Sequence, residues 1–367
     1  MTSTLVADRF TPAGLERVWQ LLADAVATDR TPAVSVVVGS SSGASEQRSF
    51  GRHRAAPESP PLRNDALFLI ASPTKPIVAM AVMMLVEEGR LQLADPVSAY
   101  VPEFHSNGKR NITLLHCLTH TSGLPDMLPD NARLRGAQAP LSEFLARACE
   151  LKPDFLPGFD VQYQSLGYLL LGEVVRRVSG RSVADMLAER VFAPLGMKNT
   201  SLGLEGQYER IPEIRVSGVQ LSGASYWNEP YWRRLGVPWG GLFSDAADLG
   251  KLCRHLLNVH RGAAGVINRG TLEIMTANWF ERMPDVPERH RRCFPWGLGW
   301  QLHWPAHATT FGDLLSRSAY GHWGSTGTML WIDPQRDAFA VALSTEPLEL
   351  GRRWLARFSS AVCAAIA

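Results

Sequence analysis

Apolar residues recur with helical spacing near both ends of the chain, and short β-branched runs lie next to these segments. Thr11 and Pro12 form a cap and a proline at a first helical position, and the pattern after them predicts a helix over residues 12–27. A valine-rich run at 33–38, a glycine-bounded turn and a second run at 48–52 are typical of a β-hairpin. The chain is therefore expected to open with a helix followed by a hairpin.

The longest strongly apolar run follows a further short strand predicted at 67–71. It extends from Ile77 to Val86 and covers about half the length that a membrane-spanning helix needs. We interpret it as part of a buried helix from Ser72 to about residue 88. No contact with a membrane is expected.

The middle of the chain is mainly helical, and strand character returns only near the end. Helices are predicted at 114–119, 141–150, 166–178, 183–195, 246–259 and 348–366, and strands at 298–303, 328–332 and 338–344. Strands at both ends with helices between them indicate an α+β fold, in which the terminal helices flank one antiparallel sheet and a mainly helical lobe is inserted. We predict a single domain, 1–367, with an α/β lobe at about 1–71 and 291–367 and a helical lobe at about 72–290.

Charge and cysteine content exclude several classes of function. The formal charge is only +2 and the basic residues are dispersed, so a nucleic-acid partner is not expected. The first ten residues lack a basic stretch followed by a sustained apolar one, which argues against a secretory signal and for a cytoplasmic protein. The five cysteines are widely separated, so we expect reduced thiols, no metal site and no cofactor. The oligomeric state stays open.

The tetrapeptide Ser-Pro-Thr-Lys at 72–75 is the first candidate for chemistry. A serine becomes a nucleophile when a base is near, and a lysine one helical turn later can serve as that base. The spacing alone arises by chance, but only five of the 37 basic residues are lysines. Lysine, unlike arginine, can lose its proton when buried. We expect Ser72 to cap the helix, with Pro73 at its first position.

Two later segments strengthen this candidate. Tyr163-Gln164-Ser165 leads into a helix, and Gly321-His322-Trp323-Gly324-Ser325-Thr326-Gly327 occupies a predicted strand region. Together with Ser72 and Lys75, these segments resemble the Ser-x-x-Lys, Tyr-x-Asn and Lys-Thr-Gly motifs of serine β-lactamases and penicillin-binding proteins. Within that superfamily the chain looks most like class C β-lactamases and family VIII carboxylesterases. Three further segments also match: Leu118–Leu124, Gly240–Ser244 and Trp296–Trp300.

The resemblance implies a β-lactamase/transpeptidase-like fold and an acyl-enzyme mechanism. Ser72 would be the acylated nucleophile, and Lys75 and Tyr163 would share the proton transfers, with an ammonium near the phenol lowering its pKa. Which of the two is the base stays open. The backbone N–H groups of Ser72 and Ser325 would form the oxyanion hole.

Two departures from the motifs bear on the substrate, which the resemblance would bring against Ser165, His322, Trp323 and Gly324. Gly324 would let its strand approach the substrate closely. His322 stands where the motif has lysine, and it is mostly neutral at pH 7. Ser165 replaces the asparagine whose amide both donates and accepts hydrogen bonds. Both changes favour neutral short or medium acyl esters and predict weak β-lactamase activity. Tyr226, Trp227 and Trp232 are candidates for an apolar acyl pocket, although they could equally be packing residues.

Other interpretations remain open. Within enzymes, the same chemistry would serve a D-amino-acid amidase or peptidase, or an acyltransferase, acting on a small-molecule amide or ester. A different class is an inert scaffold or binding protein that kept the fold. The segment Gly39–Gly43 matches the Gly-x-Ser-x-Gly elbow of α/β-hydrolases, but a strand instead of a helix is expected after it. His116 and His120 have metal-site spacing, yet the second position of that motif is Cys117 and not glutamate.

Overall fold

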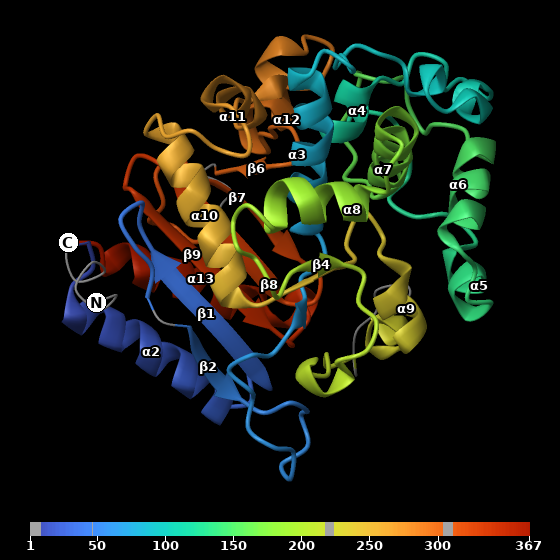
Figure 1. Cartoon of the computed structure of the whole chain (residues 1–367). Coiled ribbons are helices and arrows are strands. Elements are labelled where there is room, and N and C mark those ends of the chain that lie inside the picture. Colours follow the sequence, from blue (N-terminus) through green and yellow to red (C-terminus); the bar gives the residue numbers. More distant parts are fainter. Residues whose placement is uncertain (1–8, 46, 217–223, 304–310) are drawn as a thin grey trace.

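A six-stranded antiparallel sheet forms the centre of the molecule, with strand order β2-β1-β9-β8-β7-β6 (Figure 1). The structure, a computed structural model, describes residues 9–45, 47–216, 224–303 and 311–367, without the side chains of 224–225 and 349–353. The expectation of no secretory signal therefore rests on a segment mostly outside the described residues. The strands are β1 Ala33–Gly39, β2 Arg48–Gly51, β6 Gln301–Leu302, β7 Tyr320–Gly324, β8 Thr328–Asp333 and β9 Ala338–Ser344.

The sheet joins the two ends of the chain, as predicted. β1 pairs with β9 in antiparallel register, with Val34 opposite Ser344 and Gly39 opposite Phe339. β1 also pairs with β2, which confirms the hairpin. Its turn brings Ser40 N–H within 2.8 Å of Gly43 O, and a strand follows it, so Gly39–Gly43 is not a nucleophile elbow.

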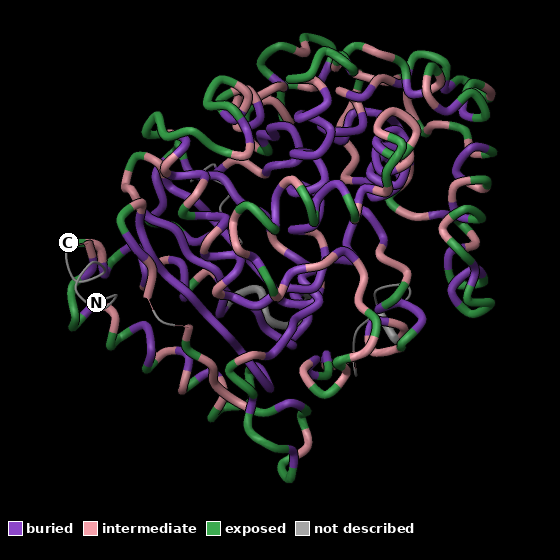
Figure 2. The backbone as a smooth tube through the Cα atoms, viewed as in Figure 1, coloured by how far each residue is buried: buried purple, intermediate pink, exposed green. Residues whose placement is uncertain are grey.

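Both faces of the sheet are covered, and β1 is buried along its whole length (Figure 2). Its residues alternate between the two faces. Val34, Val36 and Val38 pack in one cluster with the terminal helices α2 (Pro12–Ala27) and α13 (Leu348–Ala364). Val37 packs in the other cluster, which includes residues of α10 (Ala246–His260). The terminal helices flank the sheet as predicted, and α10 covers the opposite face.

A second, small sheet contains the strand that precedes Ser72. β3 (Phe68–Leu69) pairs with β5 (Leu242–Ser244), which pairs in turn with β4 (Ser201–Leu202). The prediction of one sheet was therefore wrong in this detail. β3 is only two residues long, and its partners come from the helical middle of the chain. The sequence therefore has no periodic pattern from which this strand pairing could be predicted.

The remaining helices form the lobe beside this small sheet. α3 is the most buried of them, with every residue from Thr74 to Leu85 buried, which confirms the predicted core helix. The other helices are α4 Leu114–Leu118, α5 Asn131–Gly136, α6 Leu141–Glu150, α7 Leu166–Ser179, α8 Val183–Leu187, α9 Pro230–Leu235, α11 Arg269–Met275 and α12 Glu288–Cys293. Short turns of 3₁₀ or π helix occur at Val97–Ala99, Pro102–His105, Ala188–Phe192, Tyr208–Arg210, Ala224–Asn228 and Trp279–Arg282.

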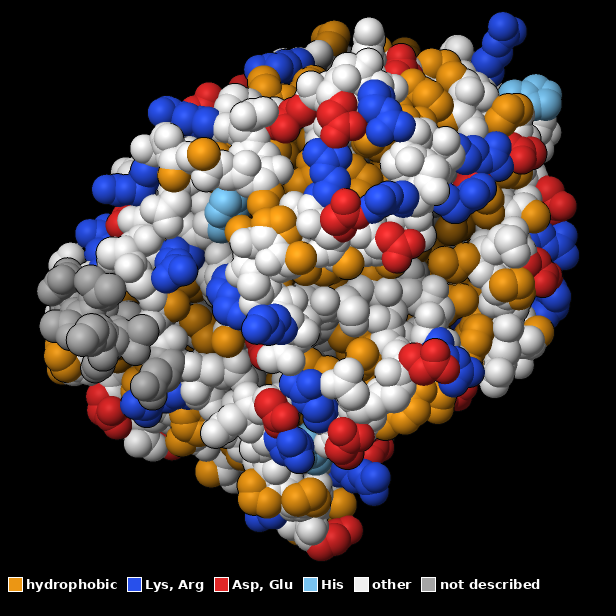
Figure 3. Space-filling view, viewed as in Figure 1, with side chains coloured by type: hydrophobic (Ala, Val, Ile, Leu, Met, Phe, Trp, Pro, Cys, Tyr) orange, Lys and Arg blue, Asp and Glu red, His pale blue; other side chains and the backbone are white. Residues whose placement is uncertain are grey.

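The surface carries both signs of charge. On the face seen in Figure 3, basic and acidic side chains are interspersed and neither sign forms a broad patch. Many are paired, for example Arg177 with Glu103 and Arg147 with Glu150, each at 2.9 Å. Within the described parts of the chain, none of the helices has the length and apolar character needed to cross a membrane.

Candidate active site

Ser72 lies in the sharp turn that joins β3 to α3. The residue before it, Ala71, has φ of 55°, a left-handed conformation that alanine rarely adopts. The turn is closed by the N–H of Thr74, which donates to Ala71 O at 2.9 Å, and by that of Lys75, which donates to Ser72 O at 2.8 Å. The partly exposed Ser72 therefore stands on a strained corner, a geometry that is common at functional sites.

The prediction that Ser72 caps the helix was wrong. α3 begins at Thr74, its N-cap is Pro73, and no side chain accepts a capping hydrogen bond there. Lys75 is then the second residue of the helix and Pro76 the third, where a missing N–H breaks no helical hydrogen bond. The Ser72 hydroxyl is thus not engaged by the helix and can interact with Lys75.

Lys75 is buried next to the serine. Its Nζ donates to Ser72 Oγ at 3.3 Å and to the main-chain oxygen of Trp239 at 3.0 Å. The side chain is fully buried, and burial lowers the pKa of Lys75 to about 7, although the charge of Asp126 acts in the opposite direction. A sizeable fraction of Lys75 is therefore neutral near pH 7 and able to accept a proton.

Tyr163 faces the same two residues from the loop before α7. The Lys75 ammonium lies 4.7 Å from the centre of its ring. Its hydroxyl is buried without a hydrogen-bond partner. Burial raises the pKa of Tyr163, and the neighbouring Ser72 side chain offsets only part of that rise. This direction is opposite to the one expected from a nearby ammonium, because the cost of burying a phenolate outweighs the attraction.

The end of β7 is fastened to the segment that leads to Ser72. Thr326 Oγ1 donates to Leu69 O at 2.7 Å, and Thr328 Oγ1 donates to Ile70 O at 2.5 Å. A Cβ added to Gly324 would lie 2.2 Å from Ile70 O, so glycine is required here for contact with the protein's own backbone. These contacts hold Ser325, the next residue, close to the corner that carries Ser72.

His322 is completely buried on β7. Its Nδ1 donates to Trp323 O at 2.7 Å, which leaves Nε2 as an acceptor, and that atom has no partner. Burial, and secondarily the charge of Lys75, lower the pKa of His322 to about 3. His322 is therefore neutral over the whole working range of pH. Trp323 stacks on Tyr163, with ring centres 5.9 Å apart and planes inclined by 18°.

The other predicted substrate residues lie at varying distances from this centre. Ser165 is buried at the start of α7, and its N–H donates to Asp126 O at 3.2 Å. The Trp232 ring lies 6.4 Å from that of Trp239, whose carbonyl holds Lys75. Trp227 is also buried and Tyr226 partly so. An acyl pocket at Tyr226, Trp227 and Trp232 stays a prediction.

Comparison with known proteins assigns the chain to a family. The family model described as Beta-lactamase matches residues 18–357. The chain belongs to the Beta-lactamase family. It is therefore a serine hydrolase of the β-lactamase and penicillin-binding-protein superfamily, as its motifs predicted.

Individual relatives carry several functional names. A "Putative D-alanyl-D-alanine carboxypeptidase" of Escherichia coli (strain K12) is 27% identical over 311 residues, which cover 77% of this chain and 69% of the relative. The solved structure of "EstCE1, a hydrolase with promiscuous acyltransferase activity" has a TM-score of 0.79 and 19% identity, covering 95% of this chain and 98% of that one. A "family VIII carboxylesterase" has a TM-score of 0.77 and 23% identity, covering 97% and 98%. The structural matches confirm the fold.

In this Beta-lactamase family member, His120 is a neighbour of the candidate site, although its spacing to His116 had suggested only a metal ligand. Its ring centre lies 4.6 Å from that of Tyr163 and 4.6 Å from that of Trp296. The available signal was the matching segment Leu118–Leu124, in which His120 is the only ionisable side chain. Among the described residues, no group of three or more His, Cys, Asp or Glu side chains is arranged to hold a metal ion.

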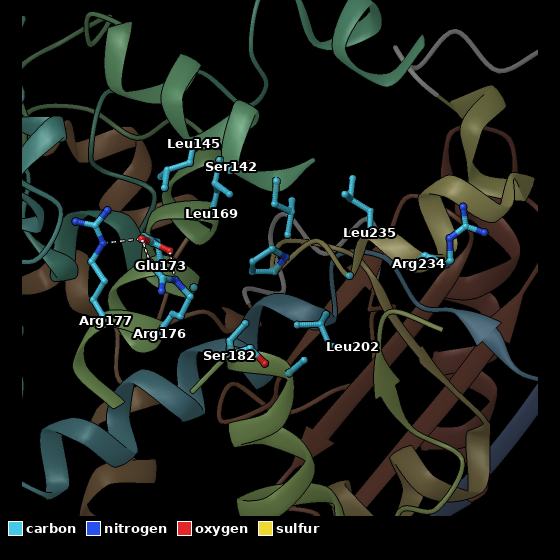
Figure 4. Close-up of a pocket in the computed structure, with 16 residues that line it drawn as sticks. Ser142, Leu145, Leu169, Glu173, Arg176, Arg177, Ser182, Leu202, Arg234 and Leu235 are labelled. Atoms are coloured by element: carbon cyan, nitrogen blue, oxygen red, sulfur yellow. Dashed lines mark hydrogen bonds and ion pairs between the residues drawn. The ribbon is translucent and has the colours of Figure 1, made fainter. Parts of the chain in front are cut away.

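A cavity of about 630 Å³ has walls that include residues of α6, α7 and α8 (Figure 4). None of the predicted site residues lines it. Leu145, Leu169 and Leu235 contribute apolar surface, and at one side Glu173 is paired with Arg176 and Arg177. Its wall also includes Pro238, the residue before Trp239.

Proposed function

We propose that the protein is a carboxylesterase that cleaves short or medium acyl esters through an acyl-enzyme on Ser72. The observation that carries this proposal is the state of His322. A neutral, fully buried imidazole stands where the lysine of the Lys-Thr-Gly motif would offer a charge, so a substrate carboxylate gains no permanent cationic partner from this residue. Neutral esters do not need one.

Lys75 is better suited than Tyr163 to take the first proton. Burial lowers the pKa of Lys75 to about 7 and raises the pKa of Tyr163. When the pKa values of two neighbouring groups are separated in this way, the group with the lower pKa is the better base and the other stays protonated and acts as the acid. We therefore assign the base to neutral Lys75, which is 3.3 Å from Ser72 Oγ. Tyr163 then acts as a phenol that passes a proton and does not begin as a phenolate.

The reaction proceeds in two steps. Ser72 Oγ attacks the ester carbonyl carbon while its proton moves to Lys75 Nζ, and the N–H groups of Ser72 and Ser325 stabilise the oxyanion. The intermediate collapses by breaking the bond to the alcohol oxygen, which receives the proton from Lys75, directly or through Tyr163. Water then attacks the acyl-serine with the proton transfers in the same order, which releases the carboxylic acid and restores Ser72.

Amide hydrolysis is the second candidate. The curated relative named as a putative carboxypeptidase supports it, whereas the carboxylesterase of known structure supports the ester. Acyl transfer would follow the same path, with an alcohol or amine in place of water. An inert scaffold is disfavoured, because an unreactive protein gains nothing from a lysine buried against a serine hydroxyl.

A substrate panel tests the proposal. We expect kcat/KM for p-nitrophenyl acetate, butyrate and hexanoate to exceed that for nitrocefin and for D-alanyl-D-alanine peptides. Ser72→Ala should lower ester hydrolysis by at least about 10⁴-fold and abolish labelling by a fluorophosphonate. Faster turnover of a cephalosporin than of any ester would contradict the esterase, and labelling that survives Ser72→Ala would contradict the nucleophile.

A further inference from the structure

One residue from elsewhere in the chain, His120, binds the main chain on both sides of Tyr163. The carbonyl oxygen of His120 accepts the N–H of Gln162 at 2.9 Å, and its Nδ1 accepts the N–H of Gln164 at 3.2 Å. The residues immediately before and after Tyr163 are therefore both bound to His120. We propose that His120 is the positioning residue for Tyr163, a role that deepens the proposed function and rests on it.

The imidazole completes this arrangement. Its ring packs against the Tyr163 ring at 4.6 Å, and Trp296 meets it edge-on from another side at 4.6 Å. Because Nδ1 accepts a hydrogen bond, the ring proton is on Nε2. Burial, and secondarily the charge of Lys75, holds the pKa of His120 well below its usual range, so Nδ1 stays an acceptor at working pH.

Tyr163 needs this external support because its buried hydroxyl makes no hydrogen bond of normal geometry, although the Ser72 side chain is near enough to affect its pKa. The polar end alone therefore does not hold the phenol firmly in place. Its position is then set by the main chain on either side and by ring packing, and His120 contributes to both. A displacement of about 1 Å at a catalytic group can lower the rate about 10²-fold.

His120 has a left-handed backbone just after the end of α4. His120 follows α4 and its C-cap Thr119 and has φ of 62°, a position at which glycine or asparagine is usual. Both of those residues would satisfy the left-handed conformation with less strain. Histidine adds a ring beside Tyr163 and a second acceptor for the Tyr163 loop.

His116, one helical turn earlier, provides a matched control. Its Nδ1 also accepts a backbone N–H, that of Thr113 at 3.1 Å, and its pKa is also lowered by burial. That bond closes a local cap at the start of α4 and involves no residue of the Tyr163 loop. Both histidines thus accept a backbone N–H at Nδ1, but His116 binds the start of its own helix and His120 binds the loop that carries Tyr163.

The experiment compares His120→Asn, His120→Gly and His116→Asn in the full chain. Asparagine tolerates the left-handed backbone and offers Oδ1 near the place of Nδ1, whereas glycine tolerates the backbone but has neither acceptor nor ring. With p-nitrophenyl butyrate we expect His120→Gly to lose about 10²-fold in kcat with KM within about threefold, because Tyr163 is displaced. His120→Asn should recover about tenfold of that loss, and His116→Asn should stay within about threefold of the parent.

Each result decides the proposal. If folded His120→Gly keeps kcat within about threefold, or if His120→Asn is as slow as His120→Gly, His120 does not position Tyr163. If His120→Gly does not fold, His120→Ala replaces it, since alanine already occupies a left-handed position at Ala71 and has neither acceptor nor ring, and the comparison with His120→Asn is unchanged. A crystal structure of the slow variant gives a readout independent of esterase activity: a displaced Tyr163 supports the proposal and an unmoved one overturns it, even if the parent hydrolyses no ester.

Discussion

Two lysines of this chain are fully buried, Lys75 and Lys109, and their surroundings are alike. The Nζ of each donates to a main-chain oxygen, Trp239 O at 3.0 Å for Lys75 and Leu151 O at 2.5 Å for Lys109. Each ammonium also lies over an aromatic ring, at 4.7 Å from the centre of Tyr163 and 5.2 Å from that of Phe104. Burial lowers the pKa of both.

They differ in depth and in one further neighbour. Lys75 stands at the start of a helix whose residues are buried for three turns, and its Nζ also contacts the Ser72 hydroxyl. Lys109 lies just beneath the surface, since the residues on either side of it are exposed. Burial alone therefore does not mark a reactive lysine. Chemistry requires a deep site together with a group whose proton the lysine can take.

Replacing each lysine by methionine gives the largest expected contrast. Lys75→Met removes the proposed base and should lower kcat/KM for p-nitrophenyl butyrate about 10³-fold, within the range for general base catalysis. Lys109→Met should keep activity within about threefold and lower the free energy of unfolding by about 1–3 kcal/mol, because Leu151 O loses its donor. Equal losses of activity in the two variants, both folded, would show that the lysines do not differ in function.

Tyr163→Phe makes the ring beside Lys75 the same as the one beside Lys109. The aromatic contact with the ammonium is kept and only the hydroxyl is lost. We expect kcat to fall about 10²-fold if the phenol passes a proton as proposed. Phe104→Tyr is the reciprocal control and should leave kcat unchanged. Full activity of Tyr163→Phe would reduce Tyr163 to a packing residue.

The pH dependence separates the two lysines further. Because the pKa of Lys75 is about 7, kcat/KM should rise about tenfold per pH unit below that value and level off above it. Lys109→Met should keep this profile. Between pH 7 and about 10.5 the unfolded chain binds one proton more at Lys75 than the folded chain, so stability rises with pH over this window. Wild type should therefore gain in Tm relative to Lys75→Met between pH 7 and pH 9.5, and a flat rate profile from pH 5.5 to 8.5 would refute the assignment.

The sequence predicted those parts of the molecule that depend on local periodicity. β9 at Ala338–Ser344 and α6 at Leu141–Glu150 have the predicted limits. The small β3-β5-β4 sheet was not predicted, because strands of two or three residues have no measurable alternation. The start of α3 was misplaced, since the strained φ of Ala71 is a property of the folded turn and not of an alanine in a sequence.

The parts of the candidate site that depend on the identity of a side chain were predictable from the sequence. The contacts made by main-chain atoms were not. Lys75 was identified from its spacing to Ser72 and from the scarcity of lysine. Trp239 O, which also binds Lys75 Nζ, is separated from it by 164 positions, and every residue type has a carbonyl. The same holds for Gln162 N–H and Gln164 N–H, through which His120 holds the Tyr163 loop.

The smallest expected effect concerns His322, whose substitution by lysine brings a second cation near Lys75. His322 is neutral, and the charge of Lys75 already lowers its pKa, so the two sites interact. A lysine at 322 should by the same repulsion move the acid limb of kcat/KM below pH 7. It should also offer a partner to substrate carboxylates and raise the ratio of nitrocefin to ester kcat/KM about tenfold, which corresponds to about 1.4 kcal/mol. His322→Gln, which adds no charge, should change neither quantity. If His322→Lys leaves both unchanged, neutral His322 is not the basis of the proposed preference for neutral esters.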